Sequence, residues 1–180
     1  MPKIMLHKYA ALTSHLFSAT FWGSFAPFTA IGMTLAPIPT MKRILRENDV
    51  GGLPLLPYTS MFTLTFVLTI YGILINENKL IFTHGTRCVL SIIYCGIFLR
   101  NCSNSCTTLP GTPQNHKNAS AAVVFSVLSS VAIFGTNTGA QVAGFTSASL
   151  ICMLYFSPLT AMKRSISQKS SRDIPLPFAV

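Results

Sequence analysis

The chain has 180 residues, of which 50% are hydrophobic and only 9% are charged. Soluble domains carry about 25% charged residues, so this composition excludes an ordinary water-facing surface. The formal net charge is +9, but nucleic-acid-binding proteins present their basic residues on a polar face, whereas these lie in short clusters between long apolar stretches. We therefore expect an integral membrane protein whose surroundings are the lipid bilayer and which has no nucleic-acid partner.

Uncharged intervals mark the expected membrane spans. A bilayer core of about 30 Å requires roughly 20 helical residues to cross it, and backbone groups in lipid must be hydrogen-bonded internally, which favours helices. Three intervals carry no charge, and a fourth is interrupted only by Arg87. The uncharged interval between Lys117 and Lys163 is long enough for two spans, with a turn at Gly135 to Gly139. The sequence thus predicts an all-α membrane protein with about five helices, at 16–41, 55–75, 80–99, 120–136 and 142–162.

Lysine and arginine are unevenly distributed between alternate loops. Nine of them fall in 42–49, in 100–117 and after 162, whereas only Lys3, Lys8 and Lys79 lie in the other segments between spans. Positive charge stays on the cytoplasmic side during insertion. We therefore expect an outside N-terminus and a cytoplasmic C-terminus, in the plasma membrane or in a Golgi or other internal membrane.

A stretch that begins at Pro37 recurs from Pro158. The first copy reads PIPTMKRILRENDVGGLP and the second PLTAMKRSISQKSSRDIP, without a gap. Each copy is the cytoplasmic end of a predicted span followed by a polar loop, so the repeat is parallel. Secondary transporters are built from such repeats, with the substrate site between the halves. A duplicated receptor or structural protein is the alternative.

Four strings in this order resemble the SWEET sugar transporters: LAPIPTMKRIL at 35–45, LPY at 56–58, YG at 71–72 and YFSPLTAMKR at 155–164. The resemblance covers roughly residues 20–99 and 140–178, and it implies two three-helix-bundle repeats joined by a linker helix. It divides this chain into an N-terminal extracellular or lumenal segment, a first three-helix unit, a cytoplasmic loop, a linker helix, and the first helix and loop of an incomplete second unit, at 1–15, 16–99, 100–119, 120–139 and 140–180.

The resemblance implies facilitative, bidirectional transport of a mono- or disaccharide by alternating access. We expect no cofactor, and no metal site either, because Cys102 and Cys106 lack the second close pair that such a site requires. The resemblance also implies a proline hinge, at Pro37, Pro57, Pro158 and Pro175, with Pro177 as a near alternative to the last. Proline removes a backbone hydrogen bond and leaves a point at which a helix can bend. Pro57 and Pro175 equally suit the start of a helix, so both interpretations stay open for these two.

Two residues of the third predicted helix are candidate substrate ligands. The family has an asparagine that bonds sugar hydroxyls where this chain has His84, which can both donate and accept. Arg87 follows one turn later, about 10 Å into the bilayer by helical rise. Such an arginine extends to the membrane surface, bonds backbone carbonyls in the bundle, or contacts the substrate. The last interpretation favours a small organic acid or an amino acid as the solute.

The remaining expectations concern catalysis, ion coupling and assembly. His84 and Cys88 are one helical turn apart, but no acid is placed to orient the histidine, so we expect no enzyme. No carboxylate lies within a predicted span, which favours a uniporter. The second unit lacks its second and third helices. Three explanations stay open: a fragment or wrongly spliced gene product, a natural truncation that modulates a full-length partner, and a homo- or hetero-oligomer of SWEET-type units.

Overall fold

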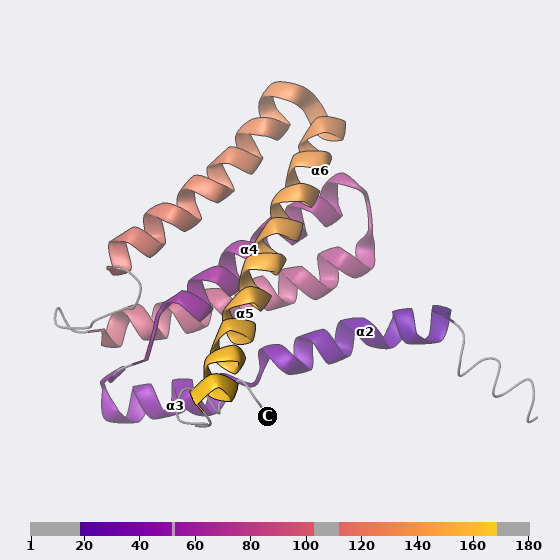
Figure 1. The fold of residues 1–180 in the computed structure, drawn as a ribbon. Coiled ribbons are helices and arrows are strands. Elements are labelled where there is room, and N and C mark those ends of the chain that lie inside the picture. Colours follow the sequence, from indigo (N-terminus) through magenta and orange to yellow (C-terminus); the bar gives the residue numbers. More distant parts are fainter. Residues whose placement is uncertain (1–18, 52, 103–111, 169–180) are drawn as a thin grey trace, which may run out of the picture.

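The structure is a computed structural model that describes residues 19–51, 53–102 and 112–168. Every regular element in these ranges is a helix (Figure 1). The predicted all-α class is therefore confirmed. The division of the chain into two units stays a prediction. The helices are α2 (Ala19–Thr34), α3 (Ile38–Glu47), α4 (Leu56–Leu74), α5 (Asn78–Asn101) and α6 (Pro113–Gln168).

Two helices, α2 and α3, replace the single helix predicted for 16–41. The chain leaves the helix between Leu35 and Pro37, because proline has no N–H to donate and its ring crowds the preceding turn. The N–H of Leu35 bonds the carbonyl of Gly32, and the N–H of Ile38 bonds the carbonyl of Leu35, both at 3.0 Å. The prediction of one continuous first span is therefore wrong, since the apolar interval is divided just before Ile38.

Three of the described helices are long and apolar enough to cross a membrane, namely α4, α5 and α6. The described part of α2 is 16 residues long and contains no charged residue. In α6, Gly135 has φ 81° and ψ 178°, a backbone conformation essentially restricted to glycine. The chain turns back there, so α6 consists of two legs, 113–134 and 136–168 (Figure 1). The predicted turn between the last two spans is confirmed at Gly135.

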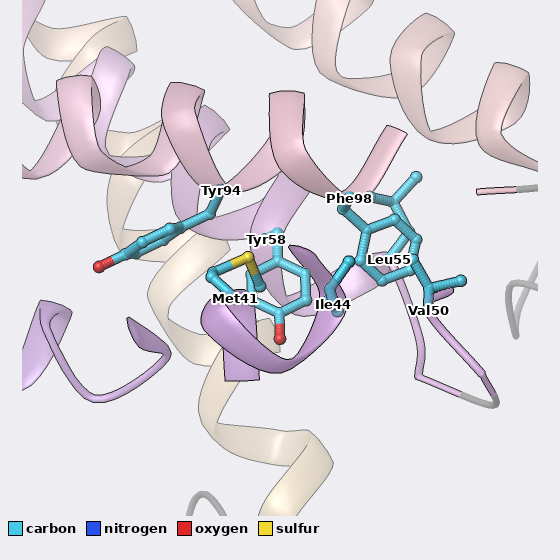
Figure 2. Packing of buried hydrophobic residues seen from close by; sticks show 7 residues of the cluster. All are labelled: Met41, Ile44, Val50, Leu55, Tyr58, Tyr94 and Phe98. Carbon is cyan, nitrogen blue, oxygen red and sulfur yellow. The ribbon is translucent and has the colours of Figure 1, made fainter. Parts of the chain in front are cut away.

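The bundle is centred on the pair formed by α4 and α5, which the short connection from Ile75 to Glu77 makes antiparallel. α6 packs against α4, whereas α2 and α3 pack against α5. One core cluster joins α3 to the start of α4 and the end of α5 (Figure 2), and its members are Met41, Ile44, Val50, Leu55, Tyr58, Tyr94 and Phe98. A second cluster of Val67, Val127 and Ala143 joins α4 to both legs of α6.

Large apolar side chains cover much of the outside of the bundle. Among them, Trp22, Phe28, Phe125 and Phe145 are each more than half exposed. A soluble monomer rarely exposes apolar patches of this extent, but side chains of this kind suit contact with lipid. The short helix α3 differs, because it buries Met41 and exposes its basic residues. It is thus built for a boundary between protein and water rather than for the bilayer core.

Candidate functional site

Both predicted substrate ligands lie on α5, three residues apart and half-buried, so they share one helix face. The Nδ1 atom of His84 is buried and has no hydrogen-bond partner among the described residues. Buried polar atoms normally have a partner, and leaving one without costs about 1–3 kcal/mol. His84 therefore keeps one hydrogen-bonding atom unused within the described part of the chain. Its assignment as a substrate ligand stays a prediction.

Arg87 reaches from α5 to the end of α2. Its Nε donates a hydrogen bond to the Oγ1 of Thr34 over 2.8 Å, and the Thr34 hydroxyl itself donates to the carbonyl of Ala30 over 3.0 Å. Thr34 is 2% exposed, so this bond lies inside the helix contact. Of the three interpretations of Arg87, bonding within the bundle describes this contact best, although the acceptor is a hydroxyl. A role in binding substrate stays a prediction.

A second α5 residue also meets Thr34. The hydroxyl of Tyr94 donates to the backbone carbonyl of Thr34 over 3.0 Å. In an unbroken helix that carbonyl would accept from the N–H of Ile38, but Ile38 bonds Leu35 instead. Tyr94 therefore supplies the donor that the break removes. Sequence reasoning missed this contact, and the available signal was a carbonyl located just before a proline-bearing break.

The four predicted hinge prolines occupy different structural positions. Pro37 lies in the break, as the residue that caps the start of α3. Pro57 lies in the first turn of α4, where proline is commonly found. Pro158 lies within the second leg of α6, and Pro175 lies outside the described residues. Among the described positions, Pro37 is thus the proline located where two helices meet.

Two pairs of hydroxyl groups connect α4 to its neighbours α5 and α6. The Thr63 hydroxyl of α4 donates to that of Ser120 in α6 over 2.8 Å, and the hydroxyls of Thr65 and Ser91 lie 3.3 Å apart between α4 and α5. Interhelical hydrogen bonds of this kind contribute on average about 0.6 kcal/mol in membrane proteins. They hold α4 in register with both of its neighbours.

An open groove of about 580 Å³ lies between the end of α4 and the second leg of α6. Tyr71 forms one wall, and Gln141, Ser147 and several small residues form the other. Gly144 allows a close approach, because a Cβ there would lie 3.3 Å from the Tyr71 ring. A tyrosine ring and an amide are groups that can contact a sugar. Neither predicted ligand on α5 lines this groove, so the structure does not join the two features into one site.

Comparison with known proteins finds similarity to one family of membrane proteins. A family model described as "Sugar efflux transporter for intercellular exchange" matches residues 20–105. The chain is 25% identical over 161 residues to the bidirectional sugar transporter SWEET7 of Arabidopsis thaliana, a match that covers 88% of this chain and 62% of that protein. It is also 25% identical over 167 residues to the sugar transporter SWEET1 of Dictyostelium discoideum, covering 89% of this chain and 74% of that protein. Residues 20–105, a little under half of this chain, are thus similar to the SWEET family.

The family model covers α2 from its second residue, together with α3, α4 and α5, and thus includes His84, Arg87 and the contact of Arg87 with Thr34. This similarity, together with the three long apolar helices, indicates an integral membrane protein. The chain spans about three fifths of the length of the first curated relatives that it matches.

Proposed function

We propose that this protein is a transporter of the SWEET family that moves a mono- or disaccharide across a membrane in both directions, down its gradient. The observation that carries the proposal is the match of a sugar-transporter family model to the continuous segment 20–105. It is supported by several relatives whose names describe bidirectional sugar transporters. Among the described helices, α4, α5 and α6 contain no Asp or Glu, which favours a uniporter over an ion-coupled pump.

The proposed mechanism is alternating access with bending at the prolines. α3 is held to the start of α4 and the end of α5 through Met41 and Ile44, whereas the main packing partner of α2 among the described helices is α5. Bending at Pro37 would therefore change the angle of α2 while α3 stays fixed. In this proposal Pro57, Pro158 and Pro175 serve as the corresponding hinge positions.

His84 is the proposed sugar ligand in the first unit, because its unpaired Nδ1 can bond a hydroxyl of the solute. The test is uptake of radiolabelled glucose, fructose and sucrose into vesicles that contain the purified full chain. We expect saturable uptake that does not depend on a proton or sodium gradient. His84→Ala should lower uptake, and His84→Asn, which restores the amide typical of the family, should preserve it. Absence of uptake of all three sugars by correctly inserted protein would contradict the proposal.

Arg87 favours a second candidate, a carrier of a small organic acid or an amino acid. A guanidinium located within a membrane span can balance the charge of an anionic solute. The same vesicles distinguish the two functions: Arg87→Gln should abolish transport of an anion but leave part of the transport of a neutral sugar. A third candidate, a subunit that modulates a full-length SWEET partner, predicts co-purification with that partner and no flux by this chain alone.

A further inference from the structure

We propose that Thr34, Arg87 and Tyr94 form a latch between α2 and α5 that sets the angle of α2 at the break before α3. In this arrangement Arg87 and Tyr94 are positioning residues that act through Thr34. The inference rests on the proposed alternating-access function, and it adds which contacts control the bend.

Two independent bonds meet at one residue. Arg87 donates to the side-chain hydroxyl of Thr34 over 2.8 Å, and Tyr94 donates to its backbone carbonyl over 3.0 Å. Arg87 and Tyr94 are seven residues apart on α5, two helical turns, so they project from the same face. Thr34 is the last residue of α2. The latch therefore acts at the one point of α2 that any change at the break must move.

The backbone break makes the tyrosine bond conditional on the bend. The carbonyl of Thr34 lacks its usual helical donor, because Ile38 bonds Leu35 and Pro37 has no N–H. A buried carbonyl without a donor is costly, so the present angle of α2 is favoured only while the Tyr94 hydroxyl is within reach. If α2 leans away, that carbonyl must find another donor.

The α5 side of the latch is anchored. Tyr94 is 3% exposed and belongs to the core cluster, and Figure 2 shows its hydroxyl directed away from the other six residues of that cluster. The Ser91 hydroxyl donates to the carbonyl of Arg87 over 2.7 Å and lies 3.3 Å from the Thr65 hydroxyl of α4. The α4–α5 pair thus forms the fixed side of the latch, and the end of α2 forms the side that moves.

The arginine bond gives the latch its strength. Hydrogen bonds donated by a charged group are stronger than neutral ones, and within a helix contact the guanidinium requires partners. Loss of either bond should still leave a folded bundle, because the core cluster around Met41 and Ile44 does not include Thr34. We therefore expect the variants below to change the angle of α2 rather than to prevent folding.

The direct test measures the distance between spin labels on α2 and α5 in nanodiscs, without sugar. Labels carried by genetically encoded amino acids at positions 23 and 96 suit this purpose, because both positions are glycines at which an added Cβ would meet nothing within 4 Å. They also leave the native cysteines in place. We expect one dominant distance in the parent protein.

Two variants each remove one hydrogen bond of the latch, and a third variant keeps both. Thr34→Val deletes the hydroxyl but keeps the carbonyl, Tyr94→Phe deletes only the phenolic hydroxyl, and Thr34→Ser is the matched control that keeps both acceptors. Loss of one interhelical bond should populate a second label-to-label distance, in which α2 has moved away from α5. The ratio of this second population to the parent one should rise about three- to tenfold. Unchanged distances in Thr34→Val and Tyr94→Phe would overturn the latch.

A transport measurement separates the latch from a merely structural role. In an alternating-access carrier, the apparent half-saturation concentration on one side rises as the fraction of protein facing that side falls. Thr34→Val and Tyr94→Phe should therefore shift the half-saturation for sugar entry and for sugar exit in opposite directions. Equal loss of maximal rate in both directions, with unchanged half-saturation, would contradict the inference. If the parent moves no sugar, the proposed function fails, but the distances still decide whether the latch exists.

Discussion

Gly139 is the position where an added methyl group should disturb the bundle most. A Cβ at this residue would lie 2.5 Å from the Cγ2 of Val131 and 2.9 Å from its Cα. A side chain can rotate away, but the Cα belongs to the other leg of α6, so the two legs must move apart. Overpacking of this kind typically costs about 1–3 kcal/mol. We expect Gly139→Ala to destabilise the protein by about that amount relative to a control that shares its gain in helix propensity.

Gly96→Ala is that control, because a Cβ there meets nothing within 4 Å and the helix gains up to about 1 kcal/mol from the replacement. Gly144→Ala should fall between the two, since its neighbour at 3.3 Å is the side chain of Tyr71, which can shift. The assay is unfolding in mixed micelles of increasing dodecyl sulfate content, followed by circular dichroism. The reasoning is refuted if Gly139→Ala and Gly96→Ala unfold at the same dodecyl sulfate fraction.

Three further variants test other parts of the fold by the same unfolding assay. Phe98→Ala should lower the free energy of unfolding by about 3 kcal/mol, because this residue is 0% exposed. Phe125→Ala should lower it little, because that residue is 73% exposed. Equal losses would contradict the assignment of Phe98 to the core. A double-mutant cycle of Thr63→Val and Ser120→Ala should give a coupling energy of about 0.6 kcal/mol. A coupling energy of zero would contradict the hydrogen bond between these two hydroxyls. Gly135→Ala should cost about 1–3 kcal/mol, since its φ of 81° suits glycine; an unchanged midpoint would argue against the turn.

The positions of α4 and α5 could be predicted closely from the sequence. Predicted spans at 55–75 and 80–99 correspond to Leu56–Leu74 and Asn78–Asn101, because charged residues bound the apolar intervals on either side. The prediction of the first span was wrong, because no charged residue marks the point where the helix ends. The apolar composition continues across Pro37, so hydropathy does not register that a backbone donor is missing there. The burial of Met41 and Ile44 beside exposed basic residues shows that α3 is an amphipathic helix of its own.

The candidate site could be predicted in part. Arg87 and His84 are noticeable in the sequence because polar groups are rare within an apolar helix. Thr34 and Tyr94 are not, because a threonine hydroxyl in a helix usually bonds its own backbone and because tyrosine is one of many aromatic residues in this chain. Their contact joins residues 60 positions apart, and only the packing of α2 on α5 brings them together. A sequence pattern within one helix carries no information about that neighbour.

The turn at Gly135 also determines how far α6 extends on each side of it. At 1.5 Å per residue, the leg 113–134 is about 33 Å long, close to the thickness of the hydrocarbon layer, whereas the leg 136–168 is about 50 Å long. With Gly135 at one boundary of that layer, Lys163 and Arg164 lie about 42 Å along the longer leg. Held along the membrane normal, the longer leg therefore exceeds the thickness of the hydrocarbon layer by about 20 Å, whereas the shorter leg matches it.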